Sequence, residues 1–223
     1  MAKLTALLVV LVLLSAVPAN AQNFVGFETQ ANPAGFHLLL DSWMEKTWQV
    51  SDKQKLGLFE FSIASTSGFD QIYAGPAWYP RDWVQLTIGI GTEHHEHPWR
   101  VGGYLAMFGR LGTVLIGLED GGSGSWYLAK YTHKVSDKVS VGVYSRRFNP
   151  TGGVVEIKAS KRYTVWTALG VDIETHEKKA IIGLNVAVAE GPARKAPMLR
   201  IIFHPRYLAI GLAIVVATWL VMQ

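Results

Sequence analysis

Short runs of alternating hydrophobic and polar positions follow one another along the middle of the chain. In the run 83–91 every second residue from Val84 to Ile90 is a large aliphatic residue, and the residues between them are small or polar. The runs 138–146, 163–173 and 179–189 repeat this pattern. A period of two is typical of β-strands whose two faces meet different surroundings. The pattern therefore predicts an antiparallel β protein.

Turn residues separate these runs, and no sustained helical period lies between them. Examples are Asn32-Pro33-Ala34-Gly35, Gly121-Gly122-Ser123-Gly124 and Asn149-Pro150-Thr151-Gly152-Gly153. Regular spacing without a break in composition indicates one domain. The predicted strands are 23–30, 36–49, 55–64, 71–78, 83–91, 99–108, 111–119, 125–133, 138–146, 154–160, 163–173 and 179–189.

The composition of the two strand faces favours a membrane barrel over a soluble sandwich. One face is aliphatic and the other is rich in glycine and small polar residues, as expected when strands meet lipid outside and a lumen inside. A soluble sandwich normally carries more Lys and Glu on its polar face. The run 111–119 is the exception, because it is apolar on both faces.

The connections show a second pattern, since short and longer ones alternate. The short connections are 80–82, 109–110, 135–137 and 160–162, and the longer ones are 92–98, 120–124, 147–153 and 174–178. Alternation places all short turns at one rim and all longer loops at the other. Transmembrane barrels have this arrangement, with short periplasmic turns and longer extracellular loops.

The N-terminus has the pattern of a secretory signal peptide. Met1-Ala2-Lys3 gives a positive start, residues 4–17 are apolar, and Ala19-Asn20-Ala21 fits a small-x-small cleavage site. We predict a signal peptide over residues 1–21, and therefore export of the chain.

The C-terminal part contains a basic linker, residues 191–206, and a hydrophobic segment, residues 207–223. The apolar run is shorter than most membrane-spanning helices. Three interpretations stay open: a C-terminal membrane anchor, a helix packed on the domain's own apolar surface, or further strands with a turn at His204-Pro205-Arg206. The basic residues before the run favour a cytoplasmic side, which conflicts with the signal peptide.

Composition narrows the functional classes. The mean hydropathy is +0.19 and 17% of residues are charged, which is low for a soluble domain. The net charge of +4 is spread along the chain, so no nucleic-acid partner is predicted. The absence of cysteine excludes disulfides, thiolate metal sites, a cysteine nucleophile and covalent haem attachment.

With these features the chain resembles the bacterial outer-membrane β-barrel class, from porin-like to small structural barrels. The resemblance covers residues 23–189 as a pattern of strands and connections. It implies an all-β fold, an antiparallel up-and-down barrel of about ten to twelve strands, with the C-terminal hydrophobic segment following it. The barrel domain is assigned to residues 22–190.

Charged residues on the strands are candidates for lining the lumen. In a closed interior such groups must pair with one another, and in an open one they would line a pore. With about twelve strands a narrow channel is geometrically feasible. The lumen-lining candidates are Glu60, Arg100, Lys130, Lys138, Arg146, Glu156, Lys158 and Asp172.

One histidine-rich loop is a candidate metal site. His94, His95 and His97 alternate with Glu93 and Glu96, and imidazole with carboxylate suits zinc, copper or nickel. All of these residues sit in one loop, and no second cluster completes a coordination shell. A solvated loop is the favoured interpretation.

No residue set predicts catalysis or a cofactor. His37 and Asp41 share a strand face, but Ser42 lies on the other, so they cannot form a triad. We therefore expect a non-enzymatic barrel in the outer membrane, with the lipid membrane as partner, acting as a passive pore for small solutes or as a structural envelope protein. The alternative is an exported β-sheet binding domain tethered by residues 207–223, which would include anchoring in the inner membrane.

Overall fold

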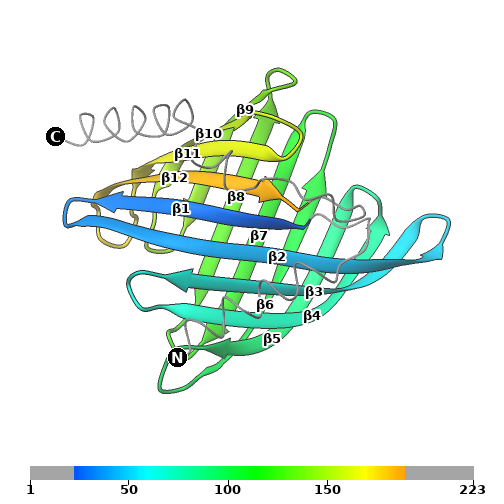
Figure 1. Ribbon diagram of the computed structural model, residues 1–223, viewed down its shortest axis with the longest axis horizontal. Helices are drawn as coiled ribbons and strands as arrows, with labels where there is room; N and C mark the ends of the chain where they lie inside the picture. The colour runs from blue at the N-terminus through cyan, green and yellow to red at the C-terminus, as the bar shows by residue number, and fades with distance from the viewer. Residues whose placement is uncertain (1–22, 189–223) are drawn as a thin grey trace, which may run out of the picture.

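The computed structural model describes residues 23–188, which form one closed sheet of twelve antiparallel strands (Figure 1). The prediction of an up-and-down barrel is confirmed, at the upper end of the expected strand number. The predicted signal peptide and the segments from residue 189 onwards lie outside the described residues. The strands are β1 (Phe24–Asn32), β2 (Gly35–Ser51), β3 (Gln54–Ser65), β4 (Asp70–Arg81), β5 (Val84–Glu93), β6 (Trp99–Phe108), β7 (Gly112–Gly121), β8 (Trp126–Lys134), β9 (Val139–Arg146), β10 (Thr151–Lys158), β11 (Tyr163–Val171) and β12 (Lys178–Ala187).

Each strand pairs with the next along the chain, and β1 closes the barrel against β12. The closing register runs from Phe24 opposite Ala187 to Ala31 opposite Ala180. Closure leaves no sheet edge with unpaired backbone groups, which is the requirement for a sheet that spans lipid. Residues 23–188 contain no helix with the length and hydropathy needed to cross a bilayer.

The outer surface carries the large aliphatic side chains that the alternation predicted. Those more than a third exposed include Leu56, Leu58, Ile72, Leu86, Ile88, Ile90, Val101, Ile116, Leu118, Val141, Val143, Val155, Ile157, Leu169 and Val171. In a water-soluble protein an apolar surface of this extent would be an aggregation hazard, whereas lipid solvates it. The closed, aliphatic-coated sheet is therefore a membrane-type barrel.

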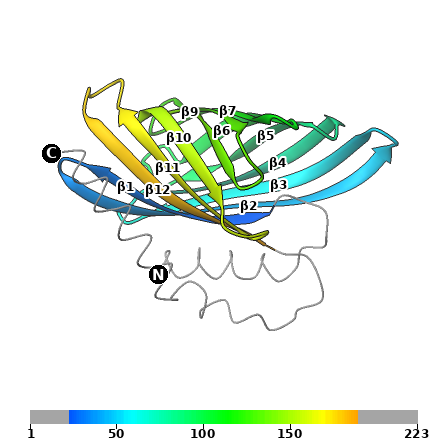
Figure 2. The same cartoon turned by 90° about the horizontal axis from the view of Figure 1, so that it is seen from above.

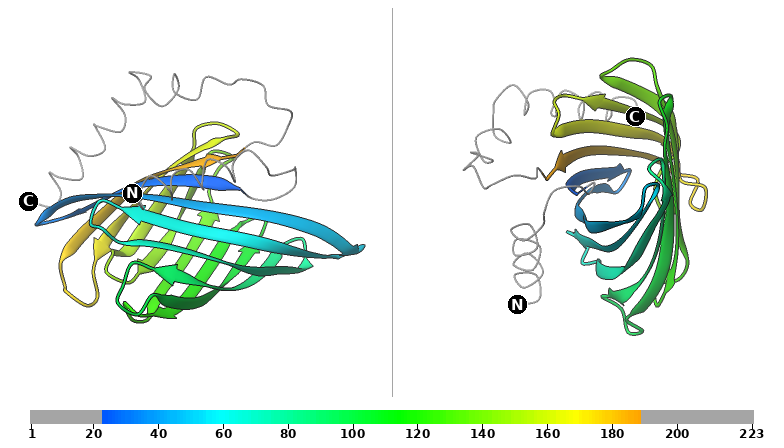
Figure 3. Two further views of the ribbon diagram at one scale, coloured as in Figure 1. Left: turned by 60° about the horizontal axis from the view of Figure 1, so that its bottom comes forward. Right: turned by 90° about the vertical axis from the view of Figure 1, so that its right-hand side faces the viewer.

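The barrel is flattened rather than round. Figure 1 shows β1 and β2 crossing steeply over β6 and β7, and Figure 2 shows the two walls facing each other. The end view on the right of Figure 3 shows the same two walls side by side. Side chains from opposite walls therefore come within reach of one another across the interior.

The connections on the two rims differ less than the sequence suggested. Those at 52–53, 82–83, 109–111, 135–138 and 159–162 have two to four residues, and those at 33–34, 66–69, 94–98, 122–125, 147–150 and 172–177 have two to six. The predicted loop 147–153 is shorter because Thr151, Gly152 and Gly153 already pair with both neighbouring strands. Asn23 and Val188 lie together at the short-turn rim, where the Val188 amide donates to the Asn23 carbonyl.

Candidate functional site

An aromatic cluster fills the interior beneath β2 to β6. The rings of Trp43 on β2 and Phe59 on β3 stack with centroids 4.8 Å apart. The Trp43 ring also meets Tyr104 on β6 edge-on at 5.6 Å, although β2 and β6 are not neighbours in the sheet. Phe61 and Tyr73 also belong to the cluster. Because it joins the two walls, the cluster narrows this half of the barrel.

Inward-facing glycines make room for these rings. A Cβ atom at Gly117 would lie 2.4 Å from Cε1 of Tyr104, and one at Gly89 would lie 2.7 Å from Cδ2 of Tyr73. An aromatic ring that covers a glycine on the next strand buries the exposed backbone. The strand face of small residues that the sequence shows is therefore partly covered by aromatic side chains, and it does not line a wide lumen there.

A buried ion network lies beside the aromatic cluster. The Arg100 guanidinium donates to Glu119 Oε2 at 2.6 Å and to Glu93 Oε2 at 2.7 Å. Glu119 also accepts hydrogen bonds from the hydroxyls of Tyr73, at 2.9 Å, and Tyr104. Glu93 accepts from the Ser123 backbone N–H and hydroxyl, each at 2.7 Å. One guanidinium therefore ties β5, β6, β7 and the β7–β8 connection together.

Polar contacts also cross the other half of the interior. Arg146 on β9 donates to Glu28 on β1 through two nitrogens, at 2.6 and 3.1 Å. Such a bidentate pair fixes the distance between two strands that are not neighbours in the sheet. Asp41 projects into the interior next to Gly26, where a Cβ would lie 1.8 Å from its Oδ1. Oδ1 of Asp41 has no hydrogen-bond partner among residues 23–188.

A more accessible ion pair lies between these contacts. Lys130 on β8 donates to Glu156 on β10 at 2.5 Å, and its ammonium lies 5.8 Å from the centroid of the Trp166 ring. The two charged side chains remain 17% and 20% exposed, whereas those of the Arg100 network are 0–3% exposed. This part of the interior is therefore in contact with solvent.

An ion pair at the longer-loop rim joins β12 to the β11–β12 connection. The Lys179 ammonium donates to Asp172 Oδ2 at 2.5 Å. Burial of Asp172 by itself would raise the pKa of its carboxyl. The hydrogen bonds from Lys179 and from the Glu174 backbone N–H, together with the charge of Lys179, hold this pKa below its ordinary value.

The interior contains more carboxyl groups than basic groups. This holds, among residues 23–188, for the interior side chains described above and the Asp172–Lys179 pair at the longer-loop mouth, together with Glu45, which accepts hydrogen bonds from Tyr79 and Gln85. Asp41 and Glu45 are the carboxylates with no basic partner within 4 Å in this part of the chain. The acidic groups are Glu28, Asp41, Glu45, Glu93, Glu119, Glu156 and Asp172, and the basic groups are Arg100, Lys130, Arg146 and Lys179.

The structure brings some of the predicted lumen residues together and leaves others outside. Five have contacts in the interior or at its mouth: Arg100, Lys130, Arg146, Glu156 and Asp172. Lys138 lies exposed in the β8–β9 turn, and Lys158 lies exposed at the end of β10. Glu60 lies on the outer face, because Phe59 and Phe61 on either side of it point inward into the aromatic cluster. The sequence-based prediction chose Glu60 for its charge and did not assign the two faces of this strand.

Sequence reasoning did not assign an interior role to several charged or aromatic residues. Glu93 was assigned only to the histidine-rich loop, Glu119 only to the end of the run 111–119, and Trp43 to no site. Their shared signal is position: each lies on the strand face opposite the exposed aliphatic side chains. A strict assignment of faces strand by strand would have indicated them.

The candidate metal-binding histidines do not converge on one point. The rings of His95 and His97 are 6.3 Å apart, and His94 Nδ1 lies 3.7 Å from Asp70 Oδ2. Within residues 23–188 the structure contains no group of three or more His, Asp or Glu side chains arranged to hold a metal ion. The loop is exposed at all three histidines.

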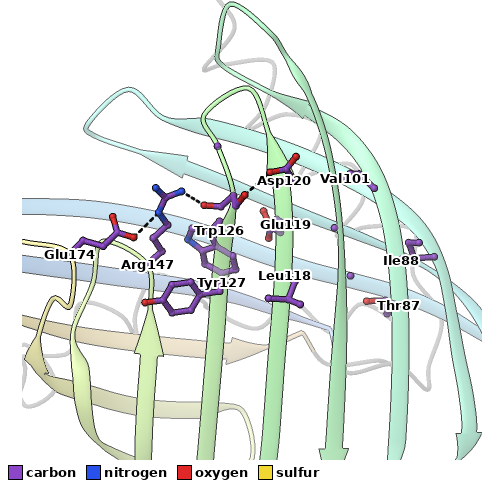
Figure 4. A pocket seen from close by; sticks show the side chains of 14 residues that line it. Thr87, Ile88, Val101, Leu118, Glu119, Asp120, Trp126, Tyr127, Arg147 and Glu174 are labelled. Atoms are coloured by element: carbon purple, nitrogen blue, oxygen red, sulfur yellow. Dashed lines mark hydrogen bonds and ion pairs between the residues drawn. The ribbon is translucent and has the colours of Figure 1, made fainter.

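A hollow of about 860 Å³ lies along β5 to β8 near the longer connections (Figure 4). Its wall includes the outward-facing Val101 and Leu118 as well as the inward-facing Glu119. At its edge Arg147 donates to Glu174 at 2.9 Å and to the Ser125 carbonyl. Because much of its wall consists of lipid-facing side chains, this hollow does not lead through the interior of the barrel.

Comparison with known proteins supports the fold. No protein-family model matches the sequence, and no curated protein sequence matches it. The KdgM porin in complex with disordered oligogalacturonate superimposes with a TM-score of 0.51 at 8% identity, over 74% of this chain and 98% of that one. A second KdgM porin structure gives a TM-score of 0.50 at 7% identity, with the same coverage. The chain therefore has a porin-like barrel fold.

Proposed function

We propose that this chain is an outer-membrane β-barrel that forms a narrow passive pore for small solutes, without enzymatic activity. The observation that carries the proposal is the Lys130–Glu156 pair, which lies inside a closed barrel with an aliphatic outer surface and is nevertheless accessible to solvent. Charged side chains that line a wet interior are the usual wall of such a pore.

The porin-like fold supports the outer membrane as the location. Its outer surface suits lipid, which does not favour a β-sheet binding domain tethered by residues 207–223. Residues 23–188 give no support to anchoring in the inner membrane.

The sign of the interior charge indicates which solutes the pore admits. Seven carboxyl groups stand against four basic groups, so we expect the interior, when these carboxyls are ionised, to attract small cations, to admit neutral solutes and to repel anions. The KdgM porin was solved with oligogalacturonate, a polyanion. The carboxyl groups in the interior of this chain would repel such a polyanion, so we expect this chain not to admit it.

Planar-bilayer recording with the purified full chain tests the proposal. In a potassium chloride gradient we expect small unitary conductance steps and a reversal potential that indicates preference for potassium over chloride. A preference for chloride would overturn the assigned selectivity.

The unpaired acid Asp41 gives a sharper test. At pH 9, where a buried carboxyl is ionised as well, Asp41→Asn removes one interior charge without breaking an ion pair within residues 23–188, so the cation preference should move toward unity. Asp52→Asn removes the same charge from the exposed β2–β3 turn and should leave the reversal potential unchanged. Equal shifts in both variants would show that overall charge, rather than the interior, sets selectivity.

A structural envelope protein is the second candidate. The observation that favours it is the pair of cross-barrel contacts, Trp43 with Tyr104 and Glu28 with Arg146, which bridge the lumen in both halves. Absence of conductance steps from barrels that are folded and inserted would support this function over the pore.

A further inference from the structure

The two rims of the barrel carry opposite charge. We count each rim as its connections plus one residue on either side. The short-turn rim then has eight basic residues, Lys53, Arg81, Arg110, Lys134, Lys138, Lys158, Lys161 and Arg162, against three acidic ones, Asp52, Asp82 and Asp137. The longer-loop rim has three basic residues, Arg146, Arg147 and Lys178, against six acidic ones, Asp70, Glu93, Glu96, Asp172, Glu174 and Glu177.

The basic side chains of the short-turn rim are exposed and mostly unpaired. Within residues 23–188, the ion pair that involves one of the eight is Lys134 with Asp137, at 2.8 Å. At the other rim, by contrast, Arg146 and Arg147 are held by Glu28 and Glu174. All five short connections contribute at least one basic residue, so the positive charge surrounds the mouth of the barrel rather than forming one cluster.

Exposed apolar residues stand beside these charges in three turns. Trp83 is 55% exposed, Leu111 is 71% exposed and Val135 is 57% exposed. Each is one or two positions from a basic residue, respectively Arg81, Arg110 and Lys134. An apolar side chain next to a cation is suited to the boundary between acyl chains and head groups, where the first enters the hydrocarbon and the second meets phosphate.

We propose that the short-turn rim binds the head groups of anionic phospholipids in the periplasmic leaflet of the membrane. Short turns of outer-membrane barrels face the periplasm. The proposal needs the barrel to span a membrane, but it does not need the barrel to conduct. Its failure is therefore distinguishable from failure of the pore.

Lipid retention by the full chain in a non-ionic detergent tests the proposal. Native mass spectrometry after addition of dioleoylphosphatidylglycerol or dioleoylphosphatidylcholine should show preferential retention of the phosphatidylglycerol. This preference should weaken as the salt concentration rises. The triple variant Arg110→Gln, Lys138→Gln, Lys161→Gln removes one charge from each of three turns. Its preference should fall on the order of a hundredfold, since each basic residue near an anionic surface contributes roughly a factor of five.

A charge-matched variant at the other rim is the control. Ala34→Glu, Ser67→Glu, Lys178→Gln lowers the net charge by the same three units at exposed positions, and should keep the preference. Heat-dependent gel migration shows whether each variant is folded. Equal loss in both triple variants, no preference in the unmodified chain, or stronger retention of lipopolysaccharide than of phosphatidylglycerol by the unmodified chain would each overturn the proposal.

Discussion

The two halves of the barrel interior use similar ion pairs in different surroundings. Beneath β5 to β7, Arg100 joins Glu93 and Glu119 at 2.6–2.7 Å with all three side chains at most 3% exposed. Beneath β8 to β10, Lys130 and Glu156 are as close, yet 17% and 20% exposed. Charge pairs without water around them fix the positions of strands, whereas charge pairs in water can exchange partners with a solute. The difference indicates that the half beneath β5 to β7 stabilises the barrel, whereas the half beneath β8 to β10 lines the proposed solute path.

The largest expected effect comes from removing the cation of each pair. Arg100→Met leaves two buried carboxylates uncompensated and should lower the free energy of unfolding by roughly 3–5 kcal/mol. Lys130→Met leaves a carboxylate that water can still reach, and should cost about 1 kcal/mol or less. Urea unfolding in micelles, followed by tryptophan fluorescence, measures both. Equal losses in the two variants would remove the distinction between a dry and a wet half.

A smaller effect is expected from filling the space under an aromatic ring. In Gly117→Val the new side chain meets the Tyr104 ring, so the cluster must shift, at a cost of roughly 1–3 kcal/mol. Gly153→Val is the matched control, since a Cβ there meets nothing within 4 Å and valine favours strands. The same urea titration compares the two. A neutral Gly117→Val would mean that the aromatic cluster is loosely packed and does not support this half.

The strands could be read from the sequence because the membrane imposes a strict period of two. Lipid requires an aliphatic outer face in every strand, and this signal recurs in Val84 to Ile90 and again in β9 and β12. The run 111–119, which is apolar on both faces, is explained by Leu115, which points inward and packs against the aromatic cluster. Fold class and strand order therefore follow from local pattern.

The arrangement of the interior could not be read in the same way. Contacts such as Arg146 with Glu28 join residues 118 positions apart, and depend on how far the barrel is flattened. Glu60 was misplaced for a related reason: the inner face of β3 is aromatic, because Phe59 and Phe61 fill space that only the opposite wall defines. Local alternation gives two faces to each strand, but it does not state which face is inside when both contain apolar residues.

The smallest expected effect concerns the ion pair at the mouth of the wet half, and appears only at low pH. The folded-state pKa of Asp172 lies below the ordinary value of 3.8, so its pairing with Lys179 stabilises the barrel above that pH. This stabilisation is lost as the pH falls from there through the lowered pKa. Urea titrations between pH 6 and pH 2 should therefore show a loss of stability in the unmodified chain that is reduced in Asp172→Asn.

Asp137 provides the control. Its pKa is also lowered, owing first to its hydrogen bond from Lys134, but its side chain is fully exposed. Asp137→Asn should therefore keep the pH dependence almost unchanged. If Asp137→Asn reduced the pH dependence as much as Asp172→Asn, burial would not explain why the Asp172–Lys179 pair stabilises the barrel. The contrast between buried and solvent-accessible ion pairs would then depend on the Arg100 network alone.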